Sequence, residues 1–184
     1  MLVAVYGVPR SGKTFLCNEV EKKLNASKVK CIHLKPSKMT DDISALYTFL
    51  TPTYPQEQRK RIVDSISEQL RAAERKHPIV ILDCHYAYPD KTGTPIPVYD
   101  TYFHEIYDEY CYMDTDPALI WQRMQQTNGI KDNYDYTINT LNEWKKAEIA
   151  GLHEILSCMG KSLHCLTGTE PQRQILDILQ GGLI

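Results

Sequence analysis

The stretch VAVYGVPRSGKT, residues 3–14, carries the strongest structural signal in this sequence. Its first four residues are apolar, as in a buried strand, and a helical pattern of apolar residues begins directly after it. The segment between them, residues 7–14, has the pattern GxxxxGK[ST], the Walker A sequence in its usual strand–loop–helix setting. We therefore predict a phosphate-binding loop; the alternative is a glycine turn that matches the pattern by chance.

The residue types in this loop suit a polyphosphate, which needs several backbone N–H donors and an approach that side chains do not block. Gly7 and Gly12 allow the required curvature, and the loop ends at a helix N-terminus, whose unpaired N–H groups favour an anion. We expect Lys13 to reach the β and γ phosphates of ATP, and the Thr14 hydroxyl to hold Mg²⁺. The loop residues expected around the nucleotide are Gly7, Val8, Pro9, Arg10, Ser11, Gly12, Lys13 and Thr14.

The composition is that of one globular domain with its own core, since 42% of the 184 residues are hydrophobic. A formal net charge of -2 supplies no extended cationic surface, so a nucleic-acid partner is not expected. The six cysteines show no CxxC pair and no zinc spacing, and we expect them to be reduced, with all but Cys158 in the core. No apolar stretch is long enough to span a membrane and no signal peptide precedes the first strand, which predicts a cytoplasmic protein.

The remaining chain alternates strand and helix patterns, which indicates an α/β fold with parallel strands joined by right-handed crossovers. Strands are predicted at about residues 29–34, 79–82, 110–113 and 161–166. Helices are predicted at about residues 13–25, 56–76, 99–109, 137–159 and 171–179, with another that Asp116 caps and Pro117 begins. Residues 87–98, rich in Pro, Gly and Thr, are expected to form an exposed loop.

Asp83 is the second chemical signal, because it ends a nearly all-apolar strand of the kind that is buried on both faces of a parallel sheet. At the carboxyl end of such a strand a carboxylate lies where ligands bind in open α/β folds, and it can support Mg²⁺. The other interpretation is an aspartate that caps a helix. His85 follows on the same edge, where it either contacts a ligand or bonds to a neighbouring carbonyl.

Other side chains have a structural and a functional interpretation. Tyr86 and Tyr88 either stack on a base or pack within the protein. Trp121 and Trp144 lie on helical apolar stripes and are predicted to be core residues. Arg10 points either to solvent or towards an acceptor pocket.

The order of these segments resembles that of the nucleoside monophosphate kinases, most closely the archaeal-type adenylate kinases. The resemblance is carried by VAVYGVPRSGKT, ILDCHY, DTDPALIWQR and NYDYT, and it extends over nearly the whole chain. It implies a P-loop NTPase fold in three layers, α/β/α, with a five-stranded parallel sheet. It also implies a small acceptor-side excursion at about residues 36–58 and a short lid at about residues 125–136, within a single domain of residues 1–184.

The same resemblance implies phosphoryl transfer from ATP, with Mg²⁺, to a small acceptor, a nucleoside monophosphate being the first choice. Arg123 would lie against the adenine and phosphates of ATP, and a lid that carries Lys131 would close over the phosphates and exclude water. The implied catalytic residues are Lys13, Asp83, Arg123 and Lys131, with Thr14 and Asp83 at the metal.

The acceptor side departs from the family pattern. The family holds the acceptor phosphate with arginines, but residues 39–58 contain none, and the second expected position falls near Pro89. The nearest cations are Lys35, Lys38, Arg59 and Lys91. Lysine replaces a bidentate arginine fork imperfectly. The chain is therefore either a kinase whose acceptor is held differently, such as a nucleoside or another small hydroxyl or phosphate compound, or a nucleotide-dependent binding or assembly factor with slow ATP hydrolysis.

Overall fold

The computed structural model describes residues 1–39, 56–89, 94–97, 105–126 and 136–181. Five strands form one sheet: β1 (Leu2–Tyr6), β2 (Cys31–Leu34), β3 (Ile79–Asp83), β6 (Glu109–Met113) and β7 (Leu163–Leu166). Their order is β2-β3-β1-β6-β7, and all neighbours are parallel. A separate antiparallel hairpin pairs β4 (Ala87–Pro89) with β5 (Pro95–Pro97). Because β1 is the central strand, the loop that follows it lies in the middle of the edge where ligands bind in such sheets.

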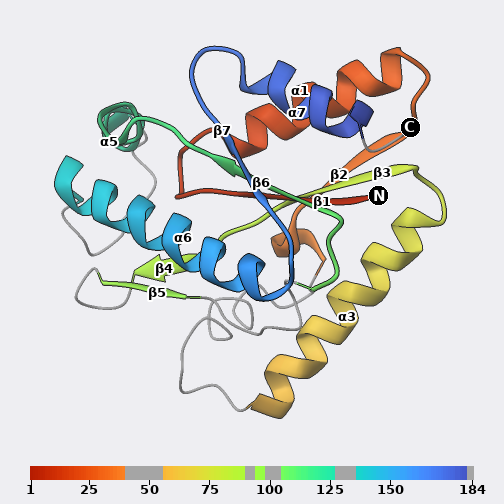
Figure 1. The fold of residues 1–184 in the computed structure, drawn as a ribbon, viewed down its shortest axis with the longest axis horizontal. Coiled ribbons are helices and arrows are strands. Elements are labelled where there is room, and N and C mark those ends of the chain that lie inside the picture. The colour runs from red at the N-terminus through yellow and green to blue at the C-terminus, as the bar shows by residue number, and fades with distance from the viewer. Residues whose placement is uncertain (40–55, 90–93, 98–104, 127–135, 182–184) are drawn as a thin grey trace.

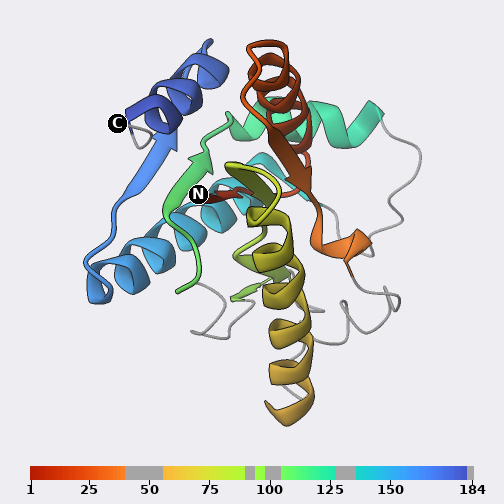
Figure 2. The same cartoon turned by 90° about the vertical axis from the view of Figure 1, so that its right-hand side faces the viewer.

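Helices cover both faces of the sheet, as Figure 1 and Figure 2 show. One face carries α1 (Lys13–Ala26) and α7 (Pro171–Gly181), and the other carries α3 (Gln56–Glu74) and α6 (Ile138–Cys158). The 3₁₀ helix η1 (Pro36–Lys38) follows β2, and α5 (Pro117–Gln126) follows β6. The predicted three-layer α/β/α fold with a five-stranded parallel sheet is confirmed. Across the described ranges, no helix combines the length and the apolar character that crossing a bilayer requires.

Successive side chains of β1 enter two different hydrophobic cores, one on each face of the sheet. Leu2, Ala4 and Tyr6 belong to the core on the α3 and α6 side, whereas Val3 and Val5 belong to the core under α1 and α7. All five residues are buried, so the apolar run does not alternate with polar residues. Each buried Val or Leu contributes about 1.5–3 kcal/mol, and β1 is therefore held firmly from both faces.

The outer edge of β2 is protected by side chains of α1. The amide of Asn25 bonds both the N–H and the C=O of Cys31, each at 3.0 Å, and Glu21 accepts from the His33 N–H at 3.2 Å. An edge strand otherwise offers such groups to another chain. The helix that follows the P-loop thus also closes one side of the sheet.

Three expectations for the loops and helices are corrected. Residues 87–98, expected as an exposed loop, contain the two strands of the hairpin. Ala87 is buried because it packs into the core on the α6 side of the sheet, and its N–H donates to Glu148 of α6. Gln125 and Gln126, predicted to begin the lid, form the last turn of α5 instead. Residues 105–108, predicted as helix, form a turn that leads into β6.

Two expectations for the core are also wrong. Trp121 is 38% exposed, because the buried part of α5 is confined to Ile120, whereas Trp144 of α6 is buried as predicted. Cys165 is exposed because β7 is an edge strand that is covered less completely than the central strands. The other cysteines predicted to be in the core are buried, and all six are free thiols.

Gly151 of α6 is required by packing, since a Cβ there would lie 2.1 Å from Tyr86 Oη and 2.5 Å from its Cζ. Tyr86 is buried and packs against the helix backbone, which supports its structural interpretation. We expect Gly151→Ala to lower the free energy of unfolding by about 1–3 kcal/mol through overpacking, measured by urea denaturation. Gly181→Ala is the control, because no described atom lies within 4 Å of a Cβ there. Equal losses in both variants would contradict the prediction.

Candidate functional site

At two positions in the loop between β1 and α1, the backbone has a positive φ that favours glycine. Gly7 has φ 146° and Gly12 has φ 105°, while Arg10 adopts φ 64° between them. A Cβ at Gly7 would also come within 3.1 Å of the Met113 carbonyl oxygen. Gly12 is the N-cap of α1 and brings no side-chain hydrogen bond to the helix end. The N–H groups in the first turn of α1 are therefore available to an anion.

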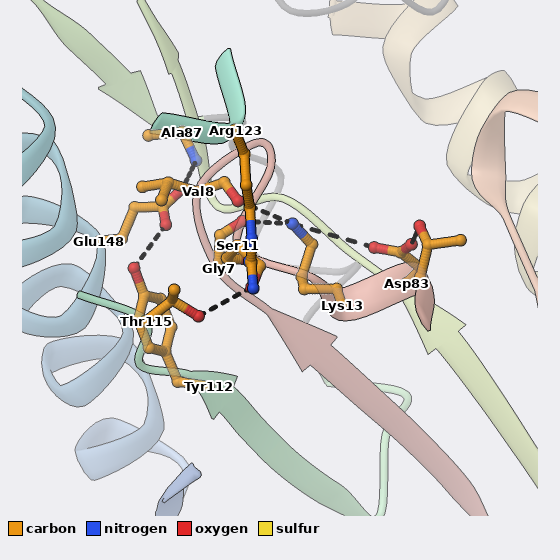
Figure 3. Close-up of polar contacts among 11 residues, drawn as sticks. Gly7, Val8, Ser11, Lys13, Asp83, Ala87, Tyr112, Thr115, Arg123 and Glu148 are labelled. Carbon is orange, nitrogen blue, oxygen red and sulfur yellow. Dashed lines mark hydrogen bonds and ion pairs between the residues drawn. The ribbon is translucent and has the colours of Figure 1, made fainter. Parts of the chain in front are cut away.

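Lys13 lies at the floor of the site, 4% exposed, where its Nζ donates to the carbonyl oxygens of Gly7 at 2.6 Å and Val8 at 3.1 Å. The same Nζ is 4.0 Å from Asp83 Oδ1 (Figure 3). Burial lowers the pKa of Lys13, and the charges of Asp83 and Glu148 oppose that change. The ammonium is thus held by oxygen atoms that a phosphate can replace.

Arg123 and Thr115 hold the loop from the side of β6 and α5. Arg123 Nη1 donates to the carbonyl oxygens of Arg10 at 3.1 Å and Ser11 at 2.7 Å, and Thr115 Oγ1 donates to Ser11 O at 2.8 Å. In a trans peptide the C=O and the following N–H point in opposite directions. Fixing the Ser11 carbonyl therefore directs the Gly12 N–H away from Arg123.

Thr14 and Asp83 meet directly, because Thr14 Oγ1 donates to Asp83 Oδ2. Hydroxyl and carboxylate oxygens are ligands that Mg²⁺ accepts alongside water and phosphate oxygens, so this pair fits the predicted metal. In the part of the chain that is described, no group of three metal-ligating side chains occurs. Asp83 precedes the hairpin rather than a helix, which makes the helix-cap interpretation wrong.

His85 lines the same site from the segment between β3 and β4. Burial, followed by the charge of the nearby Lys13, lowers the pKa of His85. Its imidazole is therefore neutral at physiological pH, and it adds no third positive charge beside Lys13 and Arg123.

These groups surround one open cavity of about 930 Å³, close to the upper end of the usual range for ligand pockets. Its lining includes residues 9–14 of the loop. The other walls come from distant segments and include Asp83, His85, Arg123, Gln126, Thr169 and Pro171. The side chain of Phe15 is 73% exposed beside this cavity. The size and the polar floor suit a nucleotide.

The structure thus brings together loop residues 9–14, Asp83 and Arg123 around the cavity, and Lys13 joins Gly7 and Val8 to them by its hydrogen bonds. Arg123 contacts carbonyl oxygens of the loop. Lys131 lies outside the described residues, as do residues 127–135 of the predicted lid and residues 40–55 of the predicted excursion.

Two contributors to the site were missed from the sequence. Thr115, in DTDP, lies two residues after the carboxyl end of β6, at the same edge of the sheet where Asp83 ends β3, and this parallel could have revealed it. Glu148 lies four residues after Trp144 and four before Leu152 on the buried stripe of α6. A charged residue at a core position of an apolar stripe was the available signal.

Neither a family model nor a curated protein sequence matches this chain. Solved structures of similar fold include deoxyadenosine kinase from M. mycoides with bound dATP, at 16% identity and a TM-score of 0.56, covering 100% of both chains. The same enzyme with the products dCMP and a flexible dCDP gives 17% identity and a TM-score of 0.56 over 98% of each chain.

An unliganded sugar kinase from Janibacter sp. HTCC2649 gives 18% identity and a TM-score of 0.57, over 97% of this chain and 92% of that one. These comparisons give no specific support to an adenylate kinase. At such identities the likeness concerns the fold, and this chain has the fold of P-loop kinase structures.

Proposed function

We propose that this protein is a kinase that transfers a phosphoryl group from Mg-ATP to a small acceptor. One observation carries the proposal: the N-terminus of α1, which no side chain caps, and the buried ammonium of Lys13 lie together at the floor of one cavity. Both favour a polyphosphate. The likeness to deoxyadenosine kinase and sugar kinase structures supports a kinase over other P-loop proteins.

The contribution of the protein to catalysis would be positional and electrostatic. During transfer, negative charge is spread over the three oxygens of the moving phosphoryl group, and donors fixed in advance stabilise it without reorganisation. Lys13 would exchange the carbonyls of Gly7 and Val8 for phosphate oxygens. Arg123, anchored on the loop, would add a second positive charge at the cavity wall.

Thr14 and Asp83 are the residues that would hold Mg²⁺, Thr14 through its hydroxyl and Asp83 through its carboxylate. When bound, the metal neutralises charge on the β and γ phosphates. Lys13 lies beside Asp83, so the Lys13 ammonium and the metal that Asp83 would hold would act on neighbouring phosphate oxygens.

We infer that the acceptor is an uncharged hydroxyl compound, with a nucleoside as first candidate. A dianionic phosphate is normally held by arginine forks. Among described residues that line the cavity, the arginines are Arg10 and Arg123, both at the donor loop, and residues 39–58 of the sequence contain none. A nucleoside monophosphate, which the resemblance to adenylate kinases implies, is the second candidate.

The proposal is tested by incubating the protein with Mg-ATP and a panel of nucleosides, nucleoside monophosphates and sugars. Phosphorylated acceptor and ADP are both measured, with ATP alone as the hydrolysis control. We expect one nucleoside class to raise ADP release well above that control and to yield its monophosphate. If no acceptor exceeds background hydrolysis, the kinase proposal is wrong and a nucleotide-dependent assembly factor becomes the better hypothesis.

A further inference from the structure

Glu148 is a fully buried carboxylate in the middle of α6 to which the phosphoryl-transfer proposal assigns no role. Its Oε2 accepts from the Tyr112 hydroxyl at 2.8 Å, and its Oε1 accepts from the Ala87 N–H at 3.1 Å (Figure 3). A carboxyl group removed from water needs such donors to stay ionised. The two bonds fix its carboxylate to β6 and to the start of β4.

The charge of Glu148 acts on the nucleotide site through Lys13. Figure 3 shows Glu148 and Asp83 on opposite sides of the Lys13 ammonium, with the turn at Val8 towards Glu148. Each of these two acidic groups raises the pKa of Lys13, Asp83 more strongly. The P-loop lysine thus lies between two acidic groups, one of which faces the cavity while the other is sealed behind the loop.

Glu148 is also poised to change its protonation. Burial raises its pKa to about 7, against the opposing effects of Lys13 from α1, the Tyr112 hydroxyl from β6 and the Ala87 N–H from β4. At neutral pH the carboxyl group is therefore divided between its ionised and protonated forms. A modest change in the local potential is enough to shift that balance.

We propose that Glu148 is a positioning residue that takes up a proton when a polyphosphate binds the P-loop, and that it thereby sets the pH dependence of nucleotide affinity through Lys13. The inference rests on the proposed nucleotide site. Bound phosphates bring negative charge to the loop and engage the ammonium that stabilises ionised Glu148, and both effects favour its protonated form. Because proton uptake and binding are linked, nucleotide affinity falls as pH rises through about 7.

Glu148→Gln separates the charge from the contacts. The glutamine amide can accept from Ala87 N–H through Oε1 and donate to Tyr112 Oη through Nε2, so both bonds are kept while the charge is removed. We expect this variant to bind Mg-AMPPNP more tightly than the wild type at pH 8, by about 3–10-fold, since one unit of pKa change corresponds to a factor of ten. A role confined to structure predicts weaker binding at every pH.

Proton uptake is measured by titration calorimetry with Mg-AMPPNP at pH 7.0 in two buffers of different ionisation enthalpy. The wild type is expected to take up more protons per nucleotide than Glu148→Gln, by up to about one, because its carboxyl group is partly ionised there. Glu143→Gln is the matched control, since Glu143 lies on the same helix but is exposed and paired with Lys146. It should behave as the wild type.

A second readout needs no nucleotide. A raised pKa in the folded state means that Glu148 favours folding at low pH and that this contribution is lost as pH rises towards and through about 7. The thermal midpoint of the wild type should therefore fall more between pH 5 and 8 than that of Glu148→Gln. Tyr112→Phe keeps the charge but removes a bond that favours the ionised form, so its proton uptake should be largest at a higher pH.

The outcomes separate the two proposals. If wild type and Glu148→Gln bind the nucleotide with the same proton uptake, the inference about Glu148 is overturned while the nucleotide site stands. The same pH dependence of the thermal midpoint in both proteins would also overturn it. If the wild type binds no Mg-AMPPNP at all, both the proposed function and the inference fail.

Discussion

Lys13→Met is expected to lower the rate of phosphoryl transfer by about 10²–10³-fold, the cost of removing one preorganised donor to a transition-state oxygen. Lys13 is the buried cation at the floor of the cavity, and methionine can occupy the space of its aliphatic stem without supplying the charge. The measurement is kcat at saturating Mg-ATP with the acceptor found in the screen, together with nucleotide affinity from calorimetry.

The matched control for this substitution is Lys22→Met, which removes a lysine from the same helix. Lys22 is exposed and pairs with Glu19, so we expect its loss to leave kcat within about twofold, consistent with the small value of surface ion pairs. Wild-type turnover in Lys13→Met, in a protein that still unfolds cooperatively, would remove Lys13 from the mechanism and with it the central part of the proposed function.

Asp83→Asn is expected to raise the Mg²⁺ concentration needed for half-maximal activity by about 10–100-fold, the usual effect of losing a group that orients a metal site. The asparagine keeps the shape and can still accept from the Thr14 hydroxyl through Oδ1, but it lacks the negative charge. Initial rates over a Mg²⁺ titration at fixed ATP give the result.

Asp114→Asn supplies the comparison, because Asp114 directly follows β6, the strand on the other side of β1, but its carboxylate is bonded to Lys145 at 2.8 Å. We expect its Mg²⁺ requirement to equal that of the wild type. An unchanged requirement in Asp83→Asn would exclude Asp83 as a metal-supporting residue, whereas equal changes in both variants would point to a general effect of negative charge at this edge.

Features encoded by neighbouring residues could be predicted from the sequence because their physical cause is local. The loop at residues 7–14 needs glycine where φ is positive, at Gly7 and Gly12. Asp116 caps α5 and Pro117 begins it, as predicted, since the Asp116 side chain accepts from the Ala118 N–H at 2.8 Å. Likewise Thr137 caps α6 at the position where the helix was predicted to begin.

Burial could not be predicted in the same way, because it depends on what packs against a segment. Trp121 and Trp144 have similar helical settings in the sequence, yet Trp121 is exposed and Trp144 is buried. The first lies on a short helix that buries only Ile120 among its described residues, while the second faces the larger core of the sheet.

By itself the sequence determined the strand–loop–helix unit at the N-terminus, the alternation of strands and helices, and the acidic residue at the end of β3. The tertiary structure alone decided which side chains hold that loop, since Arg123 and Thr115 donate to its carbonyl oxygens. It also decided that Glu148 is buried where it bonds to Tyr112 and Ala87. The physical reason is distance along the chain. A loop conformation is set within a few residues, whereas a hydrogen bond across 104 positions, such as that from Thr115 to Ser11, exists only once the sheet has brought its strands together.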